Sequence, residues 1–119
     1  MKALTILFIF TAVLFAGAKN AFAQDAAEVA PEKVKVLFEN DKVRVLEFTL
    51  KPGEETGMHS HSSHVVYFLT DGKMLTTTPD GESSEMEVKN GDTRWIDPVT
   101  HNNKNIGKSA ARTIVLELK

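Results

Sequence analysis

Short apolar runs separated by turn signals dominate residues 34–119. In KVRVLEFTL, at 42–50, apolar and polar side chains alternate. Comparable runs occupy 34–38, 65–69, 73–78, 85–89, 93–96 and 113–119. A period of two is typical of strands with one buried face, and the Asp71-Gly72 and Asn90-Gly91 pairs between runs favour tight turns. No stretch of this region has a helical period of useful length. The pattern therefore predicts an all-β domain, a sandwich or barrel, over 34–119.

The first 23 residues have a different character. Lys2 is followed by a continuous apolar run, and the segment ends in Ala21-Phe22-Ala23. These features are typical of a secretory signal peptide, so we expect a signal-peptide helix over residues 1–23 and cleavage after Ala23. A retained membrane anchor is the alternative, but the apolar run of about 16 residues is shorter than the roughly 20 that span a bilayer. We expect a periplasmic or secreted protein with no membrane partner after cleavage.

The rest of the chain is expected to form one domain behind a short leader. Residues 24–33 are small and acidic and contain Pro31, which predicts a flexible leader. Because only Lys2 and Lys19 are lost on cleavage, 12 basic side chains remain against 16 acidic ones. Without a basic cluster, the charge argues against nucleic acid as a partner. Cysteine is absent from the sequence, which excludes thiolate nucleophiles and zinc–cysteine sites.

Three of the four histidines lie together in the stretch GMHSHSSHVVYF. Residues two apart on a strand project from the same face, so His59 and His61 form a natural grip for a metal ion. His64 points to the opposite face unless the preceding serine pair forms a turn or bulge. His101 lies far downstream and can join the group only if the sheet folds back on itself. On this evidence the histidines are either metal ligands or solvated loop residues.

The spacing around these histidines resembles the two motifs of the cupin superfamily. The matching residues are Gly53, His59, His61, Gly72, Gly91, His101 and Asn105. The resemblance implies a double-stranded β-helix, a cupin-like jelly-roll barrel, with His59, His61 and His101 holding one divalent metal. The family's glutamate falls on Val65, which cannot bind a metal, so His64 beside it is a candidate fourth ligand. Imidazole donors suit Fe, Zn, Ni and Cu, and Mn is a further candidate.

The expected chemistry follows from this donor set. Three neutral imidazoles leave a divalent ion its full charge, which favours an anionic ligand and acidifies bound water. We expect a small metal-dependent enzyme that acts on a small anionic molecule. The resemblance places dioxygenase-type oxidation first among reaction types. Two alternatives stay open: a non-catalytic periplasmic module that binds a metal or small ligand, and a metal-dependent isomerase or lyase.

Three further residues are candidates for substrate binding. Tyr67 shares the face of Val65 and is a candidate proton donor near the metal. Arg94 and Trp95 are candidates for contact with an anionic or aromatic substrate. Each also has an ordinary structural interpretation, with the two aromatic side chains in the core and the arginine on a solvated face. Finally, the resemblance implies a homodimer through edge strands, for which residues 34–50 could supply the edge.

Overall fold

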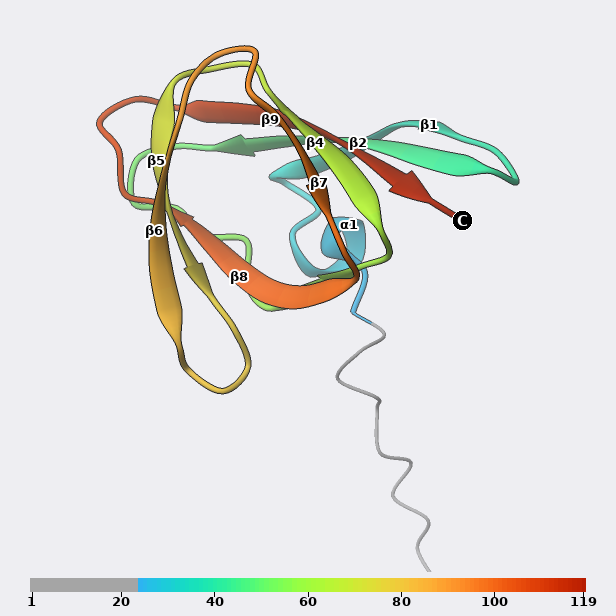
Figure 1. The fold of residues 1–119 in the computed structure, drawn as a ribbon, viewed down its shortest axis with the longest axis horizontal. Coiled ribbons are helices and arrows are strands. Elements are labelled where there is room, and N and C mark those ends of the chain that lie inside the picture. Colours follow the sequence, from blue (N-terminus) through green and yellow to red (C-terminus); the bar gives the residue numbers. More distant parts are fainter. Residues whose placement is uncertain (1–23) are drawn as a thin grey trace, which may run out of the picture.

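The computed structural model describes residues 24–119, so the signal peptide predicted at 1–23 lies outside the described residues. Within them, nine strands and one short helix form a two-layered barrel (Figure 1). The elements are α1 Ala26–Val29, β1 Val34–Glu39, β2 Val43–Leu50, β3 His59–His61, β4 His64–Phe68, β5 Gly72–Thr77, β6 Ser83–Val88, β7 Thr93–Ile96, β8 Val99–Asn105 and β9 Ala111–Leu118. The predicted all-β class is confirmed.

Two antiparallel sheets face each other. One has the strand order β1-β2-β9-β4-β7 and the other has the order β3-β8-β5-β6. From β2 onward the chain passes from one sheet to the other at every connection except the β5–β6 hairpin. This repeated crossing brings strands that are far apart in sequence, such as β2 and β9 or β3 and β8, into direct pairing. The site described below depends on that second pairing.

The core lies between the sheets and follows the sequence alternation. In β2 the buried positions are Leu46, Phe48 and Leu50, and the residues between them are less buried. In β4 the buried apolar positions are Val66 and Phe68. Full burial of such a side chain stabilises the fold by roughly 1.5–3 kcal/mol. The alternating pattern therefore directs one face of each strand inward.

The segment before β1 is packed, unlike the flexible leader expected at 24–33. Asp25 caps α1 with its side chain, and its carboxylate forms a bidentate ion pair with Arg44 of β2, at 2.8 and 2.9 Å. Ala26 and Ala30 are buried in the core, and α1 packs against β1 and β3. The small side chains that suggested a linker are those that let a helix lie close to the sheet.

β1 is an edge strand of the five-stranded sheet. Its residues Val36, Leu37 and Phe38 are 46–54% exposed, and the pairing with β2 shifts register between Val36 and Phe38. The homodimer through residues 34–50 stays a prediction, for which this apolar edge offers a surface.

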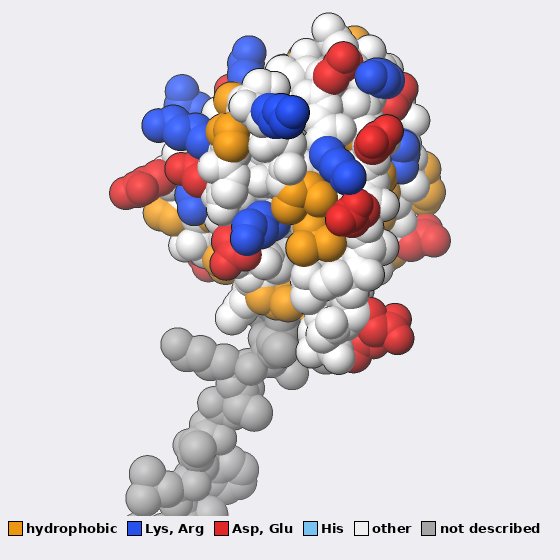
Figure 2. Space-filling model, turned by 90° about the vertical axis from the view of Figure 1, so that its left-hand side faces the viewer, with side chains coloured by type: hydrophobic (Ala, Val, Ile, Leu, Met, Phe, Trp, Pro, Cys, Tyr) orange, Lys and Arg blue, Asp and Glu red, His pale blue; other side chains and the backbone are white. Residues whose placement is uncertain are grey.

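The histidines belong to the interior. Basic and acidic side chains are interspersed on the face seen in Figure 2, and no histidine is visible there. All four histidines are at most 7% exposed, which does not fit the alternative of solvated loop residues. Within residues 24–119, no helix is both long enough and apolar enough to cross a membrane.

Candidate metal centre

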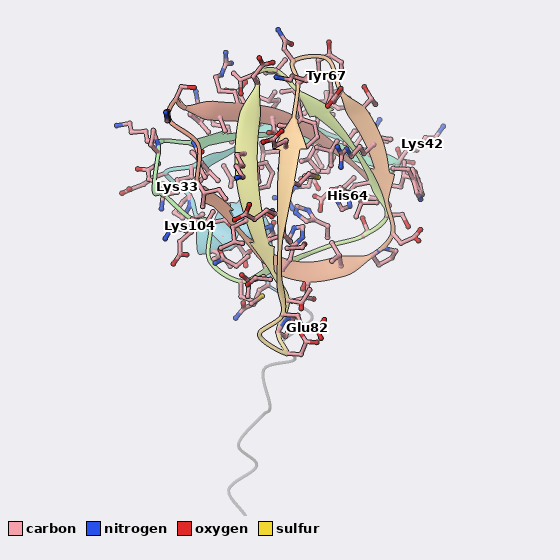
Figure 3. All side chains as sticks on the ribbon, turned by 60° about the vertical axis from the view of Figure 1, so that its left-hand side comes forward. Lys33, Lys42, His64, Tyr67, Glu82 and Lys104 are labelled. Carbon is pink, nitrogen blue, oxygen red and sulfur yellow. The ribbon has the colours of Figure 1, made fainter. Side chains whose placement is uncertain are left out.

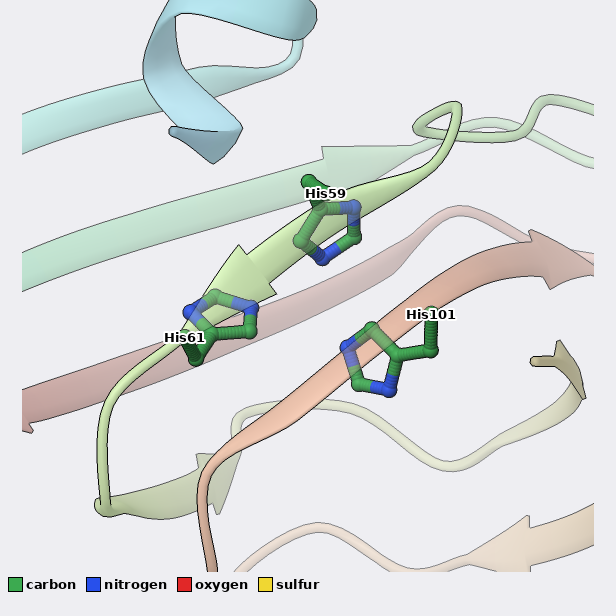
Figure 4. A group of neighbouring side chains, drawn as sticks. All are labelled: His59, His61 and His101. Atoms are coloured by element: carbon green, nitrogen blue, oxygen red, sulfur yellow. The ribbon is translucent and has the colours of Figure 1, made fainter. Parts of the chain in front are cut away.

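β3 and β8 bring three histidines together. His59 and His61 lie on β3, and His101 lies on β8 (Figure 4). The strand register pairs His59 directly with His101. One ligand nitrogen from each of the three rings lies within 4.8 Å of the others. The fold therefore unites the histidine pair of the first motif with the distant histidine of the second.

Hydrogen bonds at Nδ1 set the tautomers of the two β3 histidines. His59 Nδ1 lies 2.8 Å from the carbonyl oxygen of Gly57, and His61 Nδ1 lies 2.9 Å from the carboxylate of Glu117. These oxygens only accept, so Nδ1 carries a proton in each ring, and in a neutral ring the lone pair is then on Nε2. Nε2 of His59 is buried and has no hydrogen-bond partner among residues 24–119. A buried polar atom without a partner is costly, and a ligated metal ion would satisfy it.

The loop before β3 holds the His59 ring. Gly57 has a φ of 83°, in the left-handed region, and a Cβ there would lie 3.1 Å from Val29 Cγ1. This position therefore favours glycine. Its N–H donates to Asn102 Oδ1 at 2.9 Å, while its carbonyl accepts from His59. The hydroxyl of Thr56 lies 3.1 Å from the same ring nitrogen. These contacts orient the ring independently of any ligand.

His101 is oriented differently. Its Nε2 lies 3.2 Å from Nδ2 of Asn103, which only donates, so the lone pair of His101 Nε2 accepts this N–H here, and a metal ion bound at Nε2 would replace that hydrogen bond. The hydroxyl of Thr76 donates to Asn103 Oδ1 at 2.8 Å and thereby fixes the orientation of the amide. Asn103 lies within β8, two residues from His101 and on the same side of the strand. Both residues line the internal cavity.

Burial favours the neutral form of three of the imidazoles, those of His59, His64 and His101. It lowers the pKa of His59 to about 4, against a smaller upward effect of the Gly57 carbonyl. Burial, reinforced by the neighbouring histidines, lowers the pKa of His101 to about 3. It also lowers the pKa of His64. These rings are therefore uncharged at pH 7, which is the form that binds a metal ion.

His64 faces the interior because the chain changes sheets before it. β3 and β4 belong to different sheets, so the alternation of faces restarts after the serine pair. Figure 3 shows His64 inside the barrel, and its ring centroid is 4.6 Å from that of His61. The three-residue group within 4.8 Å does not include it. Val65 alternates away from the interior, so the inward position that the motif comparison gave to Val65 belongs to His64. A role as fourth ligand stays a prediction.

The substrate-binding candidates lie elsewhere. Tyr67 is 42% exposed and lies at the periphery of the barrel in Figure 3. Trp95 pairs with Val65 and is 56% exposed. Neither lines the cavity, so the expectation that Tyr67 lies near the candidate metal site is wrong. His64, and not Val65, takes the inward position on β4, and this shift of one residue turns Val65 and Tyr67 to the opposite face. Arg94 is exposed as well, but its guanidinium contacts Met86, a lining residue.

Behind His61, three charged side chains contact one another in series. Glu117 on β9, which accepts from His61, is 8% exposed, and its other oxygen lies 3.8 Å from Arg44. Arg44 in turn binds Asp25. A carboxylate behind a ligating histidine fixes the ring and raises its basicity. Sequence reasoning missed Glu117, although a single acidic residue inside the apolar run TIVLELK was a usable signal.

A cavity of about 290 Å³ opens beside the histidines. Its polar lining residues are Thr56, His61, His64, Thr76, Ser84, His101, Asn103 and Thr113. Its apolar lining residues are Phe48, Leu50, Val66, Phe68, Met74, Met86, Ile96, Val99, Ala111 and Val115. The lining contains no Lys, Arg, Asp or Glu within the described part of the chain.

Residues 46–117 match the family described as Cupin domain (Cupin_2). The chain belongs to the cupin superfamily. A cupin domain from Bordetella pertussis Tohama I has a TM-score of 0.67 and 33% identity to this cupin, over 72% of this chain and 91% of that one. An RmlC-like cupin from Methanocaldococcus jannaschii with a double-stranded β-helix fold has a TM-score of 0.57 and 22% identity, over 71% and 77%. The predicted fold is confirmed.

Two similar proteins have names that describe a function. The polyketide cyclase RemF from Streptomyces resistomycificus has a TM-score of 0.54 and 25% identity to this cupin, over 71% of this chain and 63% of that one. The curated "Beta-alanine degradation protein BauB" of Pseudomonas aeruginosa PAO1 is 46% identical over 48 residues, which are 40% of this chain and 50% of that protein. The match to this curated relative therefore spans half of its length.

Proposed function

We propose that this cupin binds one divalent transition metal through His59, His61 and His101 and, after export, acts as a small metal-dependent enzyme. The observation that carries the proposal is the buried Nε2 of His59, which belongs to a group of three histidines and has no hydrogen-bond partner in the described part of the chain. The lowered pKa values of His59 and His101 supply neutral donors. An all-imidazole set suits Fe, Zn, Ni and Cu and leaves Mn as a further candidate.

The cavity favours an enzyme over a binding module. A plugged barrel would suit a storage or structural role, whereas here a cavity of about 290 Å³ reaches His61 and His101. That volume is close to the lower end of ordinary ligand pockets, which span about 300–1,000 Å³. A small molecule in the cavity would therefore lie beside the proposed ligands. The binding module stays the alternative if no turnover is found.

The reaction type depends on which groups line the cavity. A bound metal ion would supply oxygen activation if it is redox-active, or polarise a bound oxygen atom if it is not. Among the described lining residues, only His61, His64 and His101 are titratable. Two of these are proposed ligands, which leaves little protein acid–base chemistry. We therefore place dioxygenase-type oxidation of a small anionic molecule first, because it depends less on protein proton donors than an isomerisation does.

A metal-dependent isomerase or lyase is the second candidate, and His64 supports it. Its Nδ1 lies 2.7 Å from the Ser62 carbonyl, so Nε2 carries the lone pair, and the ring lines the cavity. Burial lowers its pKa, so the ring is neutral at pH 7 and its lone pair is free, although it is a weaker base than an exposed histidine. The similarity to the polyketide cyclase RemF points in the same direction. β-Alanine itself, the compound in the name of BauB, is not favoured, because the described lining has no carboxylate for an ammonium group.

Elemental analysis of protein purified from the periplasm without added metal tests the proposal. We expect a transition metal in near-stoichiometric amount, and its loss in His101→Ala. The control is Lys104→Ala, on the same strand but outside the cavity lining, which should keep its metal. Oxygen uptake by iron-loaded and zinc-loaded protein then separates the two reaction types. Wild-type protein that stays metal-free even after reconstitution would overturn the proposal.

A further inference from the structure

The charge of the cavity lining restricts what can bind. Lys, Arg, Asp and Glu are all missing from the described lining residues, so neither an ammonium nor a carboxylate finds a charged partner there. Burying an unpaired charge is strongly unfavourable. Arg94 contacts the lining residue Met86 but does not itself line the cavity. Since no described lining residue is charged, the compensating charge under the proposed function is that of the metal ion at the histidines. An anionic group is therefore accepted at that end and nowhere else.

The shape of the cavity separates this end from an apolar one. His64 and Phe68 both line it and lie four residues apart on β4, which is about 13 Å at 3.3 Å per residue. Leu50 and Ala111, which pair with each other across β2 and β9, extend the apolar part. Met74 and Met86 pair across β5 and β6 and close another side. A ligand that fills the cavity must place an apolar body against these residues.

Asn103 supplies a neutral hydrogen-bond donor next to the histidines. Its Oδ1 is held by the Thr76 hydroxyl at 2.8 Å, so its NH₂ group is directed to His101, 3.2 Å away. An amide has two N–H groups, and the second one has no protein acceptor among residues 24–119. Because Asn103 lines the cavity, this N–H is available to an oxygen atom of a ligand.

We infer that the ligand of this cavity is a small monoanion with an apolar body, whose anionic oxygen lies at the histidine end and accepts a hydrogen bond from Asn103. This inference rests on the proposed function, because the ion supplies the compensating charge. Zwitterions and chain-separated dianions are rejected, since their second charged group would lie among apolar side chains. Asn103 acts here as a binding residue for the ligand, and Thr76 positions it.

Three six-carbon compounds of matched length test the inference: hexanoate, 6-aminohexanoate and adipate. Their affinities for the cobalt-loaded protein are measured by calorimetry and by the visible spectrum of the cobalt ion, after the metal content of each sample is determined. We expect hexanoate to bind at least ten times more tightly than the other two. Asn103→Ala should weaken hexanoate binding about 5- to 10-fold at unchanged metal content. Thr76→Val should weaken hexanoate binding less than Asn103→Ala does, because the variant keeps the Asn103 amide but no longer fixes its orientation. Lys104→Ala serves as the unaffected control.

The results distinguish a failure of the inferred ligand class, of the Asn103 hydrogen bond and of the proposed function. If the protein takes up cobalt but binds the three compounds equally, the inferred ligand class is wrong while the proposed function stands. If Asn103→Ala and Thr76→Val both bind hexanoate like the wild type, the assigned hydrogen bond is wrong. If the wild-type protein takes up no metal, the proposed function fails and the inference fails with it.

Discussion

Glu117→Gln tests the contribution of the carboxylate that lies behind the candidate metal centre. In the structure Glu117 accepts a hydrogen bond from His61 at 2.9 Å and is nearly buried. Glutamine has the same shape, and its amide oxygen can still accept from His61 Nδ1, so the ring keeps its orientation and loses only the negative charge behind it. Carboxylates that support ligating histidines are typically worth a factor of 10 to 100 in metal affinity. We expect the low end, about tenfold, for Glu117→Gln and about a hundredfold for Glu117→Ala, which also frees the ring.

The assay is competition with a coloured chelator for zinc at pH 7, combined with thermal denaturation. A tenfold weaker affinity corresponds to about 1.4 kcal/mol. In a domain of this size, the metal-induced rise in melting temperature should then shrink by roughly 5–10 °C. Glu47→Gln is the matched control, because Glu47 is paired with Arg112 at 3.3 Å and is not hydrogen-bonded to a histidine. If Glu117→Gln and Glu117→Ala both bind zinc within twofold of the wild type, the carboxylate does not support the site.

Other predictions concern the histidines and the outer face. If the metal is present at a hundredfold excess over its Kd, its removal by a chelator should lower the free energy of unfolding by about 2.7 kcal/mol. His61→Ala should abolish this response. A wild-type melting curve that does not move on addition of chelator would contradict the prediction. Metal-free protein should lose stability as the pH falls from 6.5, the ordinary pKa of histidine, towards 4. In the folded protein the pKa of His59 is about 4 and that of His101 is about 3, so over this range these two residues take up protons in the unfolded chain but stay neutral in the folded one. Denaturant titrations giving a constant free energy of unfolding across this range would refute it. His64→Ala should weaken metal binding less than His61→Ala, and an equal loss in a chelator competition would make His64 a ligand. Trp95→Ala should leave hexanoate affinity unchanged in calorimetry, since Trp95 lies outside the cavity lining.

Local alternation was enough to predict most strands. In β2 every second residue is apolar, and the structure buries Leu46, Phe48 and Leu50 as that pattern requires. The same reasoning put His59 and His61 on one face, because two residues are one full period of a strand. The motif spacing added His101. The first two results depend only on the chain's local period and on residue types, whereas the assignment of His101 came from the resemblance to the cupin motifs.

β8 shows where local reasoning failed. Its sequence VTHNNKN contains three asparagines, which are depleted in strands, and the alternation of apolar and polar residues predicted no strand there. In the structure β8 lies between β3 and β5, and the asparagine side chains find partners on other strands and loops. Asn105, for example, is fully buried and donates to the Leu50 carbonyl at 2.8 Å. Only the neighbouring segments make such a polar strand stable.

The faces of His64 and Tyr67 were decided by tertiary structure for a related reason. Alternation predicts relative orientation only along an uninterrupted strand, and the serine pair carries the chain from one sheet to the other. After that crossing, the side facing the core is set by the partners of β4, which are β7 and β9, and not by the count from His61. The contact of Glu117 with His61 has the same origin, because it joins positions 56 residues apart. The sequence alone determined which residues could form the site, and the pairing of distant strands decided which of them face it.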